Sequence, residues 1–123
     1  MEIKNVFLND VAKIEQRPTK GKIYPQGTII IQIAVSKGQV LYLRTEAEIE
    51  DKYAVILPRE NIEPFYLFCV IEKHFPIFFE RHKQGLNFKA EDLQRFSFPF
   101  HQNQTDREVI GKIMRCFGCN EFY

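Results

Sequence analysis

The sequence lacks any apolar run that approaches the ~18 residues of a membrane-spanning helix. Its first ten residues, MEIKNVFLND, are too polar and too mixed in charge for a secretory signal peptide. Cysteine is scarce, with three residues in a chain of 123, which argues against a disulfide-dense scaffold and favours a reducing environment. We therefore expect a cytoplasmic globular protein that does not associate with membranes.

The common catalytic fingerprints are also missing. The chain contains no H-E-x-x-H, G-x-S-x-G, Walker or dinucleotide-binding motif. Cys116 and Cys119 form one C-x-x-C pair at the predicted C-terminal end of a helix, where the helix dipole opposes a thiolate. A structural zinc needs four ligands, and Cys69 and three scattered histidines are the candidates to complete such a set. Two oxidisable thiols are a simpler interpretation than a redox or zinc site, so we expect no cofactor, no metal and no enzymatic activity.

Length and composition fit a single domain over residues 1–123. The chain is 45% apolar and 27% charged, and both values are ordinary for a globular protein. Eleven of the twelve phenylalanines follow residue 64. Because each aromatic ring buries a large apolar area, the second half should hold most of the core or a hydrophobic contact surface.

The net charge of +1 says little, but the charges are unevenly distributed. Residues 1–44 carry a balance of +4, whereas residues 45–66 carry a balance of −4. The basic segment suits contact with phosphates, and the acidic segment suits an orientation away from them or toward a basic partner. Two ordinary solvated faces would give the same pattern.

Hydrophobic patterning predicts four strands. Residues 27–34 are β-branched and almost continuously apolar, which is typical of a central strand. Residues 40–44 follow a glycine-containing turn at 36–38 and are expected to be its hairpin partner. Residues 53–57 form a third strand, and residues 96–100 alternate with period two as an edge strand does.

Two helical segments are predicted among the first 84 residues. Residues 8–14 form a short helix with Asn9 as its N-cap. Residues 61–84 form a buried helix that Asn61 caps and Pro76 breaks or restarts.

The last third predicts one helical turn at residues 90–94 and a terminal helix. Thr105 and Glu108 have the spacing of a capping box at the start of that helix. An apolar stripe follows, made of Val109, Ile110, Ile113, Met114 and Phe117. The expected fold is a mixed α+β domain, with helices packed on a twisted, mostly antiparallel sheet.

Two loop clusters and one turn carry the residues that suit nucleic-acid contacts. The first cluster lies in residues 16–27 and has three cations without an acid among them, whereas the second, at residues 81–87, mixes cations with two amides. Cations bind phosphates, and Gln and Asn can read an adenine edge. Taken singly, each cluster is more often a solvated surface, and no recognition-helix, RRM or zinc-finger signature accompanies them. The candidate nucleic-acid-binding residues are Arg17, Lys20, Lys22, Lys37, Arg81, Lys83, Gln84 and Asn87.

Four stretches of the sequence match the motifs of a known family in their order and spacing. They are LNDVAKI at 8–14, GTIII to SKGQV at 27–40, DKYAVILP to IEPFYL at 51–67, and GLNF to LQRFSFPF at 85–100. Over roughly residues 8–117 the chain resembles a target-recognition domain from the specificity subunit of type I restriction-modification systems. Three positions depart from the family pattern: His101 replaces the second proline of a P-L-P motif, and Asp106 and Arg107 replace a Glu-Gln pair.

This resemblance implies a bacterial-like protein that recognises double-stranded DNA without catalysis, because separate subunits cut and methylate DNA in that family. It implies that the candidate cations position phosphates and that Gln84 and Asn87 lie nearest to the base edges. Methyltransferase subunits are the implied protein partners. The alternative is a protein-interaction module that keeps the fold and pairs with a partner, or with a second copy, through the Phe-rich half or the terminal helix.

Overall fold

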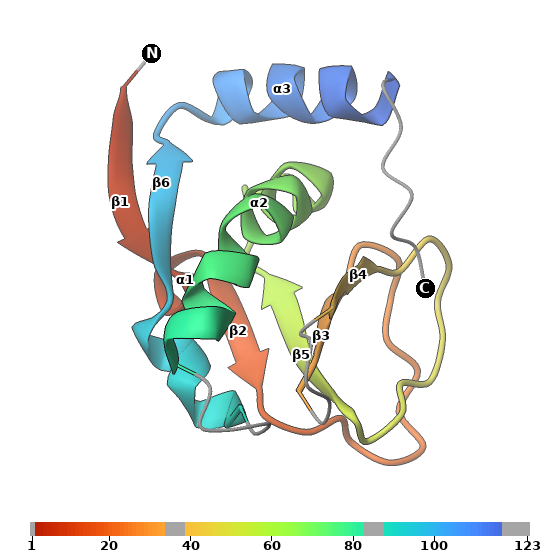
Figure 1. Ribbon diagram of the computed structural model, residues 1–123. Helices are drawn as coiled ribbons and strands as arrows, with labels where there is room; N and C mark the ends of the chain where they lie inside the picture. The colour runs from red at the N-terminus through yellow and green to blue at the C-terminus, as the bar shows by residue number, and fades with distance from the viewer. Residues whose placement is uncertain (1, 34–38, 83–87, 117–123) are drawn as a thin grey trace.

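The computed structural model describes residues 2–33, 39–82 and 88–116, and these residues build two antiparallel sheets (Figure 1). The larger sheet has the strand order β2-β5-β3-β4. Its strands are β2 (Ala12–Glu15), β3 (Ile29–Gln32), β4 (Gln39–Tyr42) and β5 (Tyr53–Pro58). The smaller sheet pairs β1 (Ile3–Phe7) with β6 (Ser97–His101). The antiparallel, mixed α+β architecture predicted from the sequence is confirmed. The expectation of one sheet that includes residues 96–100 is wrong, because β6 pairs with β1 in a sheet of their own.

The helices lie mostly on one side of the larger sheet. They are α1 (Leu8–Val11), α2 (Pro64–His82), the 3-10 helix η1 (Ala90–Arg95) and α3 (Gln104–Cys116). Figure 1 shows α2 between the two sheets, with α3 lying across its end. Among the described residues, no helix is both long and apolar enough to cross a bilayer.

Strand β3 is central, as its continuous apolar run predicts, because it pairs with β4 on one side and β5 on the other. Its side chains alternate between two clusters: Ile29 and Ile31 pack toward α2, whereas Ile30 packs on the opposite face with Leu41 and Tyr24. The sheet is therefore buried on both faces, and the predicted hairpin partner is confirmed as β4.

The larger cluster is dominated by phenylalanine, and nine of these residues are buried. Phe75 lies at its centre, with ring centroids within 6.2 Å of Phe78, Phe79, Phe88 and Phe96. The second half of the chain supplies 13 of the 22 buried residues of this cluster, whereas the smaller cluster comes from the first half alone. The expectation that the second half supplies most of the core therefore holds for the larger cluster but is wrong for the described core as a whole.

The predicted helix at residues 8–14 is wrong beyond Val11. Its first turn forms α1, but Ala12–Glu15 becomes β2 and pairs with β5. The predicted cap at Asn9 is also wrong, since the Phe7 N–H donates to the Asp10 carboxylate over 2.9 Å. Residues 12–15 form a strand because hydrogen bonding to the edge of β5 stabilises them more than the weak helical pattern of this short segment does.

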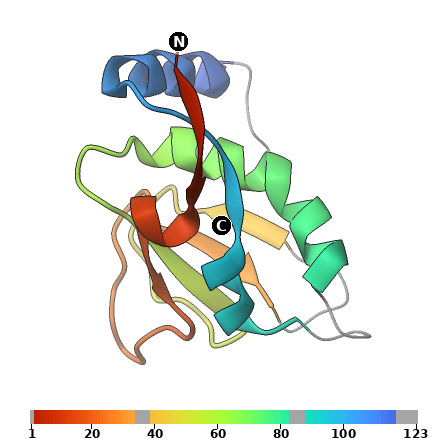
Figure 2. The same cartoon turned by 90° about the vertical axis from the view of Figure 1, so that its left-hand side faces the viewer.

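The predicted break at Pro76 is wrong as well, because α2 runs continuously from Pro64 to His82. Phe75 and Phe79 are buried on either side of the exposed Pro76, so packing holds the helix together. Figure 2 shows α2 changing direction over its second half. Glu63 rather than Asn61 caps it, by accepting the Tyr66 N–H at 2.8 Å.

Helix α3 begins at Gln104, two residues earlier than a cap at Thr105 predicts, and it has a different cap. Asn103 Oδ1 accepts the N–H groups of Thr105 (2.8 Å) and Asp106 (3.3 Å), so the cap predicted at Thr105 is wrong. The apolar stripe of α3 is largely exposed, at 48% for Val109 and 49% for Ile113. Ile110 of the stripe packs against the core, and polar residues make further contacts between α3 and α2, as described below. Phe117 lies outside the described residues.

Candidate nucleic-acid interface

The first candidate cluster lies on the connection between β2 and β3, which we call the basic loop (residues 16–27). Tyr24, fully buried, fastens this loop to the smaller core cluster. Its hydroxyl donates to Glu15 Oε1 at 2.6 Å and accepts the Thr19 N–H at 2.9 Å. Its backbone pairs with Ala47 in an isolated bridge. One buried tyrosine thus ties the loop to β2 at one end and to the β4–β5 connection at the other.

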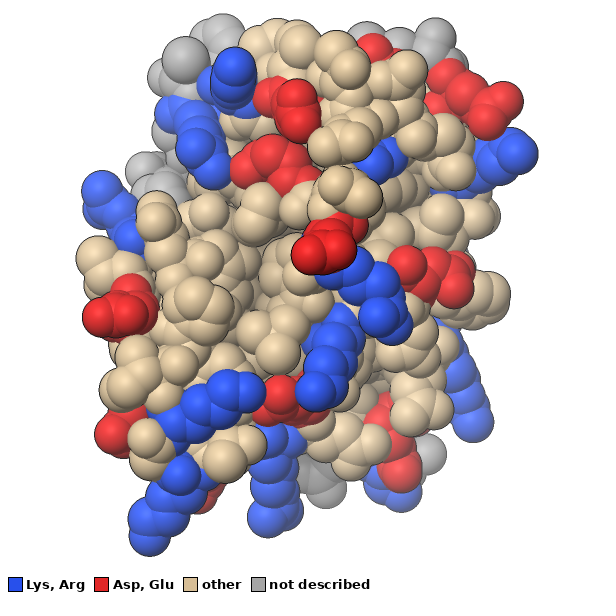
Figure 3. Space-filling model, turned by 180° about the vertical axis from the view of Figure 1, so that it is seen from behind, with Lys and Arg blue, Asp and Glu red and all other residues tan. Residues whose placement is uncertain are grey.

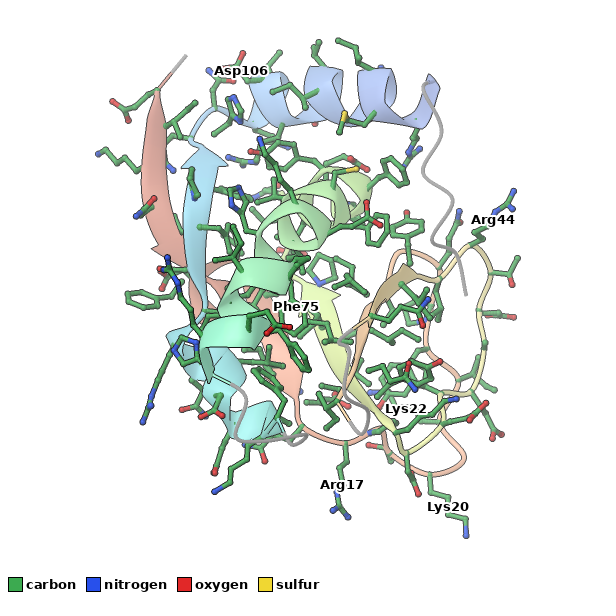
Figure 4. The ribbon with its side chains drawn as sticks, in the orientation of Figure 1. Arg17, Lys20, Lys22, Arg44, Phe75 and Asp106 are labelled. Atoms are coloured by element: carbon green, nitrogen blue, oxygen red, sulfur yellow. The ribbon has the colours of Figure 1, made fainter. Side chains whose placement is uncertain are left out.

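The tip of the basic loop is a tight turn. The Lys22 N–H donates to the Thr19 carbonyl at 3.2 Å, and Gly21 has a φ of 80°, which favours glycine. This turn lifts Lys20 away from the sheet. Figure 4 shows Arg17 and Lys20 pointing away from the body of the molecule, at the end opposite α3.

The three cations of the loop differ in their surroundings. Lys22 Nζ lies 3.8 Å from Glu15 Oε2 and 4.7 Å from the ring centre of Tyr24, so its charge is partly neutralised. Arg17 and Lys20 are exposed and have no ion-pair or hydrogen-bond partner among the described residues. They are therefore the cations of this loop most readily available to a phosphate.

Acidic residues lie beside the basic loop. The bridge from Tyr24 to Ala47 sets residues 45–51 against it, and the exposed Glu46 and Glu48 flank Ala47. Figure 3 shows Lys and Arg side chains projecting along the lower part of the rear face, interspersed with Asp and Glu. The two charge blocks seen in the sequence are thus neighbours in space, and the local potential is mixed.

The second candidate cluster is described in part. Arg81 is exposed in the last turn of α2, whereas Lys83, Gln84 and Asn87 lie outside the described residues, as does Lys37 of the hairpin turn. Figures 1 and 2 both place the end of α2 away from the basic loop. The described residues therefore do not bring Arg81 together with Arg17 and Lys20.

One further cation lies beside the loop and was not singled out from the sequence. Lys13 is exposed on β2, one strand residue before Ile14, and it has no ion-pair partner among the described residues. The period-two alternation of β2 puts its side chain on the solvent face. The sequence would indicate that Lys13 is exposed only if residues 12–15 were predicted to be a strand.

A hollow of about 310 Å³ lies where the basic loop ends. Gln26, Gly27 and Thr28 form one wall, and the segment from Leu57 to Ile62 forms another. Arg59 is fixed there because its guanidinium donates to the Asn9 carbonyl at 2.8 Å. Its polar side chains among the described residues are Gln26, Thr28, Arg59, Glu60 and Asn61, and the Thr28 hydroxyl donates to the Pro25 carbonyl rather than to a base.

The residues with shifted pKa values do not form a catalytic group. Burial raises the pKa of both Tyr42 and Tyr66, although cationic Arg115 and the His101 backbone N–H, respectively, partly oppose this. Burial, with a smaller contribution from Lys73, lowers the pKa of His74. Within the described ranges, no three His, Cys, Asp or Glu side chains are grouped to hold a metal ion.

Comparison with known proteins finds similar structures but no similar sequences. Neither the protein-family models nor the curated protein sequences yielded a match. The fold is similar to that of the S subunit of a type I restriction-modification system from M. genitalium, with a TM-score of 0.68 and 12% identity over 91% of this chain. The HsdS subunit from Thermoanaerobacter tengcongensis gives 0.61 and 16% over 90% of this chain.

A third structure, from a study of complex assembly and conformational transition of the type I R-M system, gives a TM-score of 0.64 and 14% identity over 94% of this chain. This chain spans about 38%, 36% and 38% of the three matched chains. At these identities the likeness concerns the fold, and at that level it confirms the resemblance predicted from the sequence. The chain has the mixed α+β fold of one segment of type I S subunits.

Proposed function

We propose that this chain is a non-catalytic recognition module of a type I restriction-modification system, a single domain in the cytoplasm that binds double-stranded DNA. The likeness of nearly the whole chain to three type I structures carries the proposal. The exposed, unpartnered cations of the basic loop support it independently.

In this proposal the basic loop positions the protein on the phosphate backbone. Arg17 and Lys20 make the principal phosphate contacts, with Lys13 and Lys22 beside them. Arg81 and the predicted contacts of Lys37, Lys83, Gln84 and Asn87 would extend the interface, with the two amides at base edges. Methyltransferase subunits are the protein partners that this proposal names.

Fluorescence anisotropy with a random-sequence duplex pool tests the proposal. If the three unpaired cations Arg17, Lys20 and Lys13 each contact one phosphate, the logarithm of affinity falls with the logarithm of salt with a slope of about −2.7, so raising salt from 50 to 200 mM should weaken binding about 40-fold. Selection of a preferred site from the same pool would follow. Absence of binding at 50 mM salt would contradict the proposal.

The exposed stripe on α3 favours a second candidate, a protein-interaction or dimerisation module that retains this fold. Val109, Ile113 and Met114 are 48%, 49% and 41% exposed on one short helix. Contiguous exposed apolar side chains of this kind commonly mark a contact surface. Their partner would be a second copy of the chain or another subunit.

Light scattering over a range of concentrations distinguishes this candidate. A mass that rises with concentration, and that Ile113→Glu returns to that of one chain, would support it. Lys112→Glu, on the neighbouring exposed position of α3, is the matched control that should leave the mass unchanged.

A further inference from the structure

An apolar groove of about 260 Å³ lies between α2, α3 and the β1–β6 ribbon, and we call it the α2/α3 groove. Its walls come from four elements: Ile3 of β1, Pro99 of β6, Val70 of α2, and Ile110 and Met114 of α3. Figure 1 shows α3 crossing over α2 beyond the end of β6. The groove lies at the opposite end of the molecule from the basic loop, so the proposed DNA interface does not use it.

The polar groups of the groove are basic or neutral. Lys73 and His74 of α2 line it, together with His101 of β6, and none of the described residues that line it is acidic. Lys73 is exposed and has no ion-pair partner among the described residues. Burial lowers the pKa of His74, which reflects the low polarity of the surroundings. An anionic group would therefore meet an uncompensated cation there.

Tyr66 holds a histidine that also lines the groove. Its hydroxyl accepts the His101 backbone N–H at 2.9 Å and lies 2.7 Å from His101 Nδ1. The groove thus combines apolar walls with the Lys73 ammonium and an imidazole.

We propose that the α2/α3 groove binds a small amphiphilic carboxylate, with its hydrocarbon body between α2 and α3 and its carboxylate at Lys73. The volume is just below the ~300–1,000 Å³ of sites for drug-sized ligands, which suits a body of a few carbons. Because residues of four elements line this small groove, it suits a short ligand better than an extended peptide. Charge complementarity sets the sign of the head group.

Octanoate is the probe, and calorimetry with the full chain is the first measurement. One equivalent of octanoate should bind saturably, and both n-octanol and octylammonium should bind more weakly. Lys73→Met should weaken octanoate binding about fivefold or more, as expected for loss of a charge-assisted contact. Lys112→Met removes an exposed lysine of α3 that does not line the groove, and it should leave the affinity unchanged.

Cys69 gives a local readout because it lines the groove and is half-buried. In a Cys116→Ser/Cys119→Ser background, octanoate should slow alkylation of Cys69 by iodoacetamide, with the same concentration dependence as binding. Met114→Trp, which fills the groove from α3, should remove octanoate binding while the chain stays folded by circular dichroism.

Three results would overturn the proposal. The first is octanol binding as tightly as octanoate. The second is Lys73→Met and Lys112→Met having equal affinities. The third is Cys69 alkylation that octanoate leaves unchanged but that slows as protein concentration rises, which would assign the groove to a second copy of the chain. DNA binding is measured separately, so failure here leaves the proposed function standing.

Discussion

At the scale of residues, two departures from the family pattern contact each other. Arg107 Nη1 donates to the His101 carbonyl at 2.8 Å, and its Nη2 donates to the Asn61 carbonyl at 3.2 Å. Tyr66 holds His101 through both its hydroxyl contacts. Arg107 is 8% exposed, and its guanidinium carbon lies 5.3 Å from the centre of the Phe100 ring. The replacements at positions 101 and 107 together fasten α3 to β6 and to the start of α2.

Tyr66→Phe tests this attachment. The substitution leaves the His101 N–H without its acceptor, and an unsatisfied group of this kind costs about 1–3 kcal/mol. Urea unfolding should show that loss in the free energy of unfolding, and hydrogen exchange should show faster exchange at the His101 amide. Unchanged exchange at that amide would mean that the hydroxyl does not hold it.

His74 gives the protein a pH dependence. Its folded-state pKa lies below the ordinary value of about 6.5, because burial disfavours the charged ring. The unfolded chain therefore binds more protons, and the free energy of unfolding should fall as pH drops from about 6.5 toward the folded-state pKa. Urea titrations at pH 5 and 7.5 should show a smaller difference in His74→Asn than in the wild type. An equal or larger difference in the variant would contradict the assignment.

At the scale of elements, the attachment of α3 depends on a glycine and a shared carboxylate. Glu63 accepts the Tyr66 N–H at the start of α2 and also pairs with Arg115 of α3 at 3.0 Å. Gly111 lies against this carboxylate, and a Cβ there would overlap Glu63 Oε2. The missing side chain therefore lets α3 approach the capped end of α2.

Gly111→Ala should reverse the usual effect of such a change. Alanine in place of glycine within a helix normally stabilises by about 1 kcal/mol. Here we expect a loss of about 1–3 kcal/mol, because Glu63 must move and α2 loses its cap. Lys112→Ala, at the next and exposed position, should change the free energy of unfolding little. A stabilised Gly111→Ala variant would show that the Glu63 side chain moves aside without loss of the α2 cap.

Much of the element pattern was predictable from the sequence, and the errors share a cause. The strands β3, β4, β5 and β6 carry apolar runs or alternation strong enough to identify them. The sequence does not predict β1 or β2, because their apolar patterns are short and their pairing depends on residues far away in the chain. The sequence wrongly predicts a break at Pro76, because aromatic packing, which no local pattern shows, keeps α2 continuous.

The candidate site was less predictable than the fold. The sequence identifies Arg17, Lys20 and Lys22 as a cluster, but only the structure separates the paired Lys22 from the other two. The acidic residues beside the basic loop also appear only when Tyr24 pairs with Ala47. The predicted roles of the candidate residues in DNA binding stay predictions.

At the scale of the whole molecule, the two proposed binding surfaces lie at opposite ends. Figure 4 shows Arg17 and Lys20 at one end and Asp106, near the start of α3, at the other. Between them lies a core of packed phenylalanine rings. DNA at the basic loop and a ligand in the α2/α3 groove would therefore not compete for space.

The salt dependence of DNA affinity tests the central claim most directly. Anisotropy titrations with a random-sequence duplex should be run between 50 and 200 mM salt for the wild type, Arg17→Gln/Lys20→Gln and the control Lys112→Gln. Each lost phosphate contact reduces the slope by about 0.9, so we expect the double variant to be flatter by about 1.8 and the control to match the wild type. Equal slopes for all three proteins, or no salt-sensitive binding by the wild type, would contradict the assignment of the basic loop to DNA.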